Sequence, residues 1–181
     1  MQAGKSSIQF EHPPIITSAA SIVGQTEGEG PLAIFFDRVE PDPTFGKKSW
    51  EEAESELQRQ TVQKCLDKAG RQAADVNCLF AGDLLGQIVA TSFGVESFDI
   101  PFFGLYGACS TMGEAMILGA MAAGAGYADR VLALASSHFA SAERQFRFPL
   151  AYGNQRPQST TWTVTGCGCV TVSYTHLTLP T

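Results

Sequence analysis

Apolar runs of strand length alternate along the chain with segments whose apolar residues recur at helical spacing. Residues 15–23, 76–81, 102–108 and 130–136 are rich in β-branched and apolar side chains, which is typical of strands buried in a sheet. Helical segments separate them, so successive strands connect as right-handed βαβ units. The pattern predicts an α/β fold with a mostly parallel sheet and helices in layers on both faces.

The boundaries of the first long helix are marked by local signals. Ser49 and Glu52 have the spacing of a capping box, in which each side chain satisfies a backbone donor of the other residue. Apolar residues then follow one helical face, and Gly70 ends the helix. A second, shorter helix is expected over residues 84–93, ended by Gly94.

A third helix, over residues 114–126, is built almost entirely from small and apolar residues. Small side chains on nearly every face predict close packing on all sides, and Thr111 with Glu114 has the spacing of another capping box. The acidic, glycine-rich loop 24–48 contains one apolar run, 32–36, which is either a short strand or a plug that packs into the core.

Composition bounds the class of protein. The chain has 181 residues, 44% hydrophobic and 17% charged, enough for one globular domain with a sizeable core. The net charge of −6 argues against nonspecific nucleic-acid binding. Five cysteines and no apolar signal core at the start favour reduced thiols and no secretion. Residues 102–128 carry a single charge, Glu114, but the helical part is too short to cross a bilayer.

The last ten residues, 172–181, match the translation of a transposon end used in building sequencing libraries. We therefore expect the natural sequence to depart near Thr171, which leaves 1–171 as the domain. The alternative is a short polar edge strand ending at Pro180. If the tail is foreign, His176 has no catalytic role, and His12 and His138 are the remaining histidines.

Cys109 is the strongest candidate for chemistry. It follows the predicted strand 102–108 and precedes a helix, so unpaired backbone N–H groups and the helix dipole favour negative charge there. Such a thiol suits either a reactive nucleophile or an anion-binding pocket, although a structural thiol is the plain alternative. Ser110 and Thr111 could donate hydrogen bonds to an anion or cap the helix.

Several motifs together resemble one family. The segment around Cys109, the small-residue helix and the strand before His138 are similar to the N-terminal half of the thiolase-like superfamily. Further segments narrow the resemblance to the stage V sporulation protein AD family: Pro-Pro-Ile-Ile at 13–16, SWEE at 49–52, AGDLL at 81–85, GLYGACSTM at 104–112, ERQFRFP at 143–149, YGNQR at 152–156 and TWTVTG at 161–166. The similarity runs from Ile8 to Gly166 and implies a layered α/β/α fold without its second half.

The resemblance implies a role in endospore formation. Members of this family are associated with binding pyridine-2,6-dicarboxylate (dipicolinate), without catalysis, for uptake into the developing spore. It implies action with membrane proteins of the same operon at the forespore inner membrane from the cytoplasmic side, without a span of its own, and a homodimer for the full-length protein. In synthases of the superfamily the cysteine that matches Cys109 is acylated with help from His and Asn of the second half. An acyltransferase is therefore the alternative function, and a structural partner with a vestigial pocket is a third.

Arginines near the C-terminal part could recognise a dicarboxylate. Arg144, Arg147 and Arg156 lie within thirteen residues, and the planar guanidinium matches a carboxylate bidentately. We expect one or two of them, with Tyr152, to bind the dianion; solvated or interfacial salt bridges are the alternative. His138 either supports the pocket or is a satisfied core histidine.

No cofactor or metal is expected. Cys167 and Cys169 would share one face of a strand, but no second pair completes a metal site, which favours packing. The glycines around Cys109 lack the Lys-Ser/Thr of a phosphate loop. Whether calcium accompanies dipicolinate is left open by the sequence.

Overall fold

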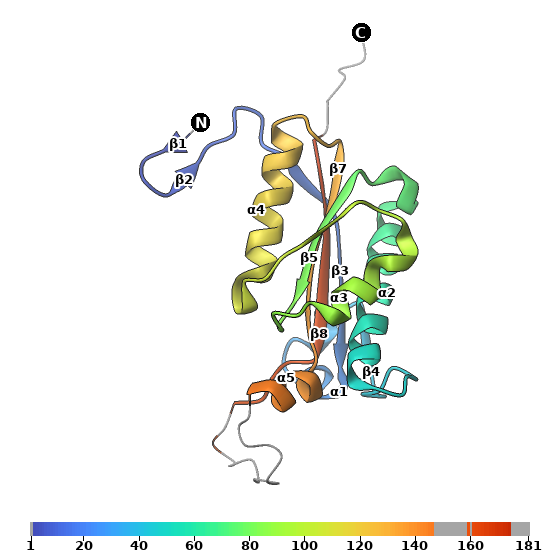
Figure 1. The fold of residues 1–181 in the computed structure, drawn as a ribbon. Helices are drawn as coiled ribbons and strands as arrows, with labels where there is room; N and C mark the ends of the chain where they lie inside the picture. Colours follow the sequence, from blue (N-terminus) through green and yellow to red (C-terminus); the bar gives the residue numbers. More distant parts are fainter. Residues whose placement is uncertain (1, 147–158, 160, 175–181) are drawn as a thin grey trace.

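A mixed β-sheet with helices on both faces forms the body of the protein (Figure 1). The computed structural model describes residues 2–146, 159 and 161–174. Within these residues the sheet has six strands, in the order β4 (Arg38–Glu40), β3 (Ile15–Gly24), β8 (Gly166–Ser173), β7 (Arg130–Ser137), β5 (Cys78–Asp83) and β6 (Phe102–Gly104). A separate small hairpin, β1 (Gln2–Ala3) with β2 (Ser7–Ile8), projects from the N-terminal end.

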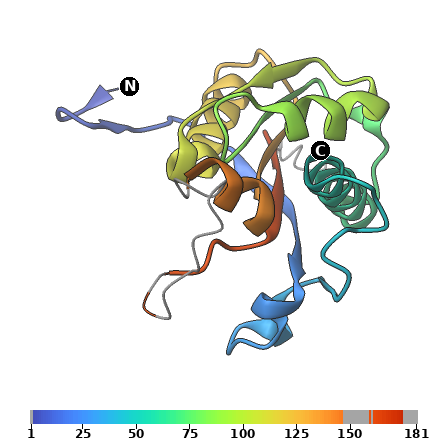
Figure 2. The same ribbon diagram turned by 60° about the horizontal axis from the view of Figure 1, so that its bottom comes forward.

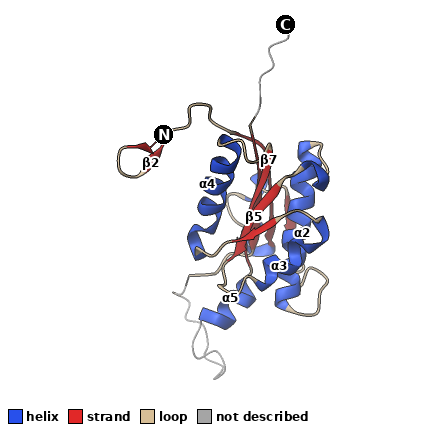
Figure 3. Cartoon of the chain, turned by 45° about the horizontal axis from the view of Figure 1, so that its top comes forward, coloured by secondary structure: helices blue, strands red, loops and turns tan. Residues whose placement is uncertain are grey.

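The helices form the outer layers of an α/β/α arrangement. They are α1 (Gln25–Gly28), α2 (Trp50–Ala69), α3 (Val89–Val95), α4 (Thr111–Gly124) and α5 (Phe139–Phe146), with 3-10 turns at Ala33–Phe35, Ala73–Asp75, Glu96–Phe98 and Ala108–Ser110. Figures 2 and 3 show α4 on one face of the sheet and α2 on the other, with α3 beside α2. The layered α/β fold predicted from the sequence is thus confirmed.

Strand direction confirms a mostly parallel sheet with one exception. Among the described strands, β8 alone runs antiparallel, and it pairs with both β3 and β7 along its whole length. The remaining pairings, β3 with β4 and β5 with both β6 and β7, are parallel. The sequence pattern did not predict this insertion, because alternation of strands and helices says nothing of a strand that returns between two earlier ones. The strand itself includes Val172 and Ser173, and the origin of residues 172–181 stays a prediction.

Helix α2 forms as predicted from its ends. The Ser49 hydroxyl accepts the Glu52 N–H at 3.3 Å, and the Glu52 carboxylate accepts the Ser49 N–H at 3.2 Å. Gly70 ends the helix in the left-handed region, with φ of 62°. The buried face of α2 packs on β3 and β8, where Leu57 and Leu66 belong to the larger core cluster.

Helix α3 differs from the prediction at both ends. It begins at Val89 rather than residue 84, after Ile88 in a left-handed conformation, and it continues through Gly94. Gly94 does not end the helix. It lies so close to α2 that a Cβ there would stand 2.8 Å from the Ser55 carbonyl oxygen. The glycine therefore permits close approach of two helices.

Helix α4 is packed on one face only, which corrects the expectation of packing on all sides. Thr111, Ala115, Gly119 and Ala123, spaced four residues apart, are buried against the sheet. On another face, Ile117 is 58% exposed and Met121 is 42% exposed. The predicted capping box is also wrong, because the Thr111 hydroxyl donates to the Ala108 carbonyl rather than capping the helix.

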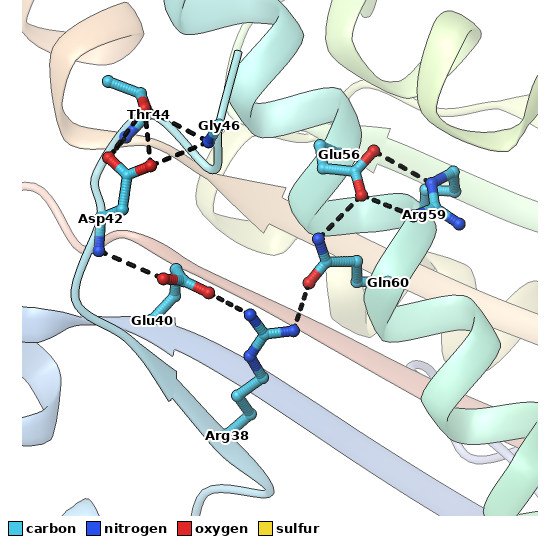
Figure 4. A network of polar contacts seen from close by, with 8 residues as sticks. All are labelled: Arg38, Glu40, Asp42, Thr44, Gly46, Glu56, Arg59 and Gln60. Carbon is cyan, nitrogen blue, oxygen red and sulfur yellow. Dashed lines mark hydrogen bonds and ion pairs between the residues drawn. The ribbon is translucent and has the colours of Figure 1, made fainter.

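The apolar run 32–36 is neither of the two expected structures. It forms the 3-10 turn Ala33–Phe35, and Leu32, Ile34 and Phe35 are exposed. The loop that follows is bound to α2 by polar contacts: Arg38 pairs with Glu40 and donates to Gln60 (Figure 4).

Candidate functional site

The corner that carries Cys109 depends on a close backbone approach between β5 and the segment after β6. Leu105 N–H donates to the Ala81 carbonyl at 2.8 Å, and the Leu105 carbonyl oxygen then lies directly over Gly82. A Cβ at Gly82 would collide with that oxygen and would reach Thr111 as well. Gly82 therefore lets the chain cross the end of the sheet and turn into α4.

The turn itself is tight. Ala108 has a positive φ of 47°, which is unusual for a residue other than glycine. Three hydrogen bonds hold it: Ser110 Oγ donates to the Gly107 carbonyl at 2.8 Å, Thr111 Oγ1 donates to the Ala108 carbonyl at 2.9 Å, and Gly107 N–H donates to Thr111 Oγ1 at 3.2 Å. Both hydroxyls thus shape the corner, and Thr111 is buried.

Cys109 is exposed at this corner, in the 3-10 turn just before the first residue of α4. Among the described residues, its thiol has no hydrogen-bond partner. A surface depression of about 580 Å³ adjoins the turn, lined by Tyr106, Gly107, Ser110, Gly113, Glu114, Ile117 and Leu118. Cysteine nucleophiles are normally activated by a neighbouring base, and in this part of the chain none contacts the thiol.

His138 lies in the core rather than beside Cys109. Its Nδ1 accepts the Ala140 N–H at 3.2 Å, so its Nε2 carries the proton and donates to the Pro43 carbonyl at 2.8 Å. Burial lowers the pKa of His138, which keeps the ring neutral at pH 7. The ring also stacks between Trp50 and Phe139. This is the geometry of the satisfied core histidine that the sequence left open.

The predicted arginine cluster is described only at its start. Arg144, on α5, is exposed and forms an ion pair with Glu51 of α2, on the face of the sheet opposite α4. Arg147, Tyr152 and Arg156 lie outside the described residues. The structure therefore brings Cys109, Ser110 and Thr111 together, but it does not bring Arg144 or His138 to them.

A buried polar network under the same edge of the sheet was not predicted. Glu54 of α2 accepts the hydroxyls of Ser136 at 2.8 Å and Ser141 at 2.9 Å. Gln58 Nε2 donates to Ser136 and to Thr91. Glu54 is 1% exposed, and its pKa is raised to about 7: burial raises it most, the two serines lower it, and a nearby carboxylate raises it further.

That nearby carboxylate is Asp83, at the end of β5. Its Oδ2 accepts the Thr91 N–H and hydroxyl, and its Oδ1 accepts the Leu85 N–H. With Glu54 it lines a cavity of about 130 Å³. One signal in the sequence could have revealed the network: Glu54 and Gln58 continue, one turn apart, the helical stripe that includes Cys65.

Cys167 and Cys169 share the face of β8 that packs under α2, as predicted, and both are buried in the larger core cluster. Cys65 of α2 lies against them, with its Sγ 3.4 Å from Thr171 Oγ1. Within the described parts of the chain, no group of His, Cys, Asp and Glu side chains could hold a metal ion.

Comparison with known proteins identifies relatives at two levels. The profile of the family "Stage V sporulation protein AD" matches residues 4–179. The stage V sporulation protein AD of Bacillus subtilis (strain 168) is 42% identical over 172 residues, which is 95% of this chain and 51% of that protein. The chain thus spans about half the length of this relative. None of the helices described here is long and apolar enough to cross a membrane.

Solved structures of ketosynthases share the fold at low identity. The 3-oxoacyl-(acyl carrier protein) synthase III of Xanthomonas oryzae pv. oryzae has a TM-score of 0.62 at 14% identity, over 95% of this chain and 59% of that one. The priming β-ketosynthase of the R1128 polyketide pathway has a TM-score of 0.59 at 14% identity, over 96% and 53%. These similarities establish a thiolase-like fold of half length. The sequence match establishes more: the chain belongs to the stage V sporulation protein AD family.

Proposed function

We propose that this chain belongs to a sporulation protein that binds dipicolinate at the Cys109 corner without chemical conversion. The observation that carries the proposal is the exposed Cys109 turn, which lies before α4 at the edge of the sheet where β5 and β6 end. In open α/β sheets ligands bind outside the carboxyl ends of the parallel strands. Backbone N–H groups at the start of the fourteen-residue α4 favour an anion there.

Two features favour binding over catalysis. The thiol meets no base among the described residues, and the corner's hydroxyls are already hydrogen-bonded to the turn. Glu114 lines the depression and would repel a dianion, so additional cationic groups are needed. Arg147 and Tyr152 remain our candidates for that part, while Arg144 would first have to leave Glu51.

Calorimetric titration of the intact protein with dipicolinate tests the proposal. We expect saturable binding that weakens at least about tenfold in Cys109→Trp, because a bulky ring would fill the corner. Arg147→Ala should weaken binding as well, since a bidentate carboxylate contact is lost. Lys5→Ala, a change in the N-terminal hairpin region, is the matched control and should leave affinity unchanged. Absence of saturation in the wild type would leave only a structural role.

The alternative, an acyltransferase with Cys109 as nucleophile, is favoured by one observation, the ketosynthase fold. Incubation of the intact protein with acetyl-CoA, followed by intact-mass analysis, separates the two functions. A mass increase of one acyl group that is absent in Cys109→Ala would support acyl transfer. An unchanged mass supports noncatalytic binding.

The remaining expectations concern partners and location. We propose that the protein acts with membrane proteins of the same operon, as a peripheral protein at the forespore inner membrane, and as a homodimer at full length. Calcium is a further variable, and the dipicolinate titration in the presence of calcium or a chelator addresses it. Support for all of these comes from membership of the family.

A further inference from the structure

A second cavity lies where β3 ends and β8 begins, and it shares no lining residue with the depression beside Cys109. Its volume is about 190 Å³. Its walls come from the β3–α1 junction, the loop before α2, the start of α5 and the segment before β8: Gly24, Gln25, Thr26, Glu27, Pro41, Pro43, Phe139, Trp162 and Thr165. One of these residues is acidic and none is basic, which gives the cavity a negative character.

The acidic residue, Glu27, is only half satisfied. Its Oε1 accepts the Thr165 N–H at 3.2 Å. Its Oε2 is closed off from water and meets no hydrogen-bond donor among the described residues. A covered carboxylate oxygen without a donor is unfavourable, and a positive charge in the adjoining cavity would offset it.

Two aromatic rings provide the surface on which such a charge would rest. Phe139 and Trp162 stack with their centroids 5.3 Å apart, and Trp162 remains 44% exposed at the rim. The faces of aromatic rings attract guanidinium and ammonium groups, while the rings also cover aliphatic chains. A carboxylate beside stacked aromatic rings therefore matches a cationic head on an aliphatic stem.

The walls are held in place before any ligand arrives. The Pro43 carbonyl accepts the Nε2–H of His138, and the Thr165 hydroxyl accepts the Phe139 N–H at 3.0 Å. The loop that contains both prolines is braced by Asp42, whose carboxylate accepts the N–H groups of Thr44 and Gly46, each at 2.9 Å (Figure 4). A site with fixed walls loses little entropy when it binds.

From this geometry we infer that the cavity is a binding site for the guanidinium or alkylammonium head of an arginine-like or lysine-like group. Glu27 supplies the charge, and Phe139 and Trp162 supply the aromatic surface. The site is separate from the proposed dipicolinate corner, because a dianion would be repelled by Glu27. It also gives buried His138 a defined part, as the residue that positions the proline wall.

Ligand-observed NMR titration of the intact protein tests this site. The probe is N-acetyl-arginine amide, and its neutral control is N-acetyl-glutamine amide, at constant ionic strength. We expect saturation by the arginine probe only. Glu27→Gln keeps an acceptor for Thr165 N–H but loses the charge, and it should raise the Kd about tenfold, as should Trp162→Ala. Glu29→Gln, an exposed neighbour outside the cavity, should change the Kd by less than about twofold.

A parallel titration with agmatine distinguishes the source of the cation. Tighter binding of the peptide-like probe would indicate a side chain of a protein partner, and equal binding would indicate free small cations as well. The inference is overturned if the arginine and glutamine probes behave alike, or if Glu27→Gln and Trp162→Ala both bind as the wild type does. Because Trp162 is half exposed, its replacement provides a folded variant even if Glu27→Gln is unstable.

Discussion

Glu54 is an ionisable side chain placed where ionisation is costly. It lies between α2, the end of β7 and the start of α5, and its nearest charged neighbour, Asp83, carries the same sign. The folded protein therefore holds a proton on Glu54 up to about pH 7, whereas an unfolded chain releases it near pH 4.5. Between these two values the folded state binds more protons than the unfolded state.

Stability should consequently fall as pH rises through this window, and Glu54→Gln should remove that fall. Relative to the wild type, the free energy of unfolding of the variant should increase between pH 5 and pH 8, by about 3 kcal/mol at most. Urea unfolding of the intact protein at several pH values measures it. Glu96→Gln, at an exposed glutamate, is the control and should show no such trend. A constant difference between Glu54→Gln and the wild type would contradict the raised pKa.

At the scale of elements, helix α3 is positioned by a glycine rather than by apolar side chains. Gly94 allows the backbone of α3 to lie on Ser55 and Gln58 of α2. On the other face of the sheet, Gly113 of α4 has open space around the position of a Cβ. The two glycines are both helical, and they differ in what surrounds them.

Replacing them should therefore have opposite effects. Gly94→Ala should destabilise the protein by about 1–3 kcal/mol, because the new methyl group meets backbone oxygen and α3 must move. Gly113→Ala should stabilise it by about 0.5–1 kcal/mol, because alanine has the higher helix propensity. Thermal unfolding of the intact variants measures both. Equal effects at the two sites would count against the close approach of α3 to α2.

The elements that could be predicted were those with local signals. Ser49, Glu52 and Gly70 mark the ends of α2, and β-branched runs mark β3 and β7. Helix α3 was misplaced because the role of Gly94 depends on a helix that lies far away in sequence. The network around Glu54 was missed for a similar reason: four glutamates occur within residues 51–56, and only the folded structure distinguishes the buried one.

At the scale of the whole molecule, the chain exposes apolar surface on α4 while it spans about half the length of its relative. Ile117 and Met121 lie on that open face, and Tyr106 is exposed beside the Cys109 corner. Large apolar patches on soluble proteins usually contact another surface. We infer that the other half of such a protein covers this face.

The 181-residue chain produced alone should therefore aggregate or lack a cooperative thermal transition. Ile117→Gln with Met121→Gln should raise the fraction of soluble monomer, measured by size-exclusion chromatography. Val89→Gln with Phe93→Gln, which changes exposed apolar residues of α3 on the opposite face, is the matched control and should help less. A monomer that already melts cooperatively without substitutions would argue against the need for a covering half.

The position of β8 has a consequence for how the protein forms. It is the last described strand to leave the ribosome, yet it lies between β3 and β7, and its partner residues in β3 precede it by roughly 150 positions. Until β8 is synthesised, the strands on its two sides have no direct pairing with each other. Such distant pairing slows folding and leaves strand edges open in the meantime. During translation the two halves of the sheet must therefore wait, unjoined and open to other strands, for this single segment.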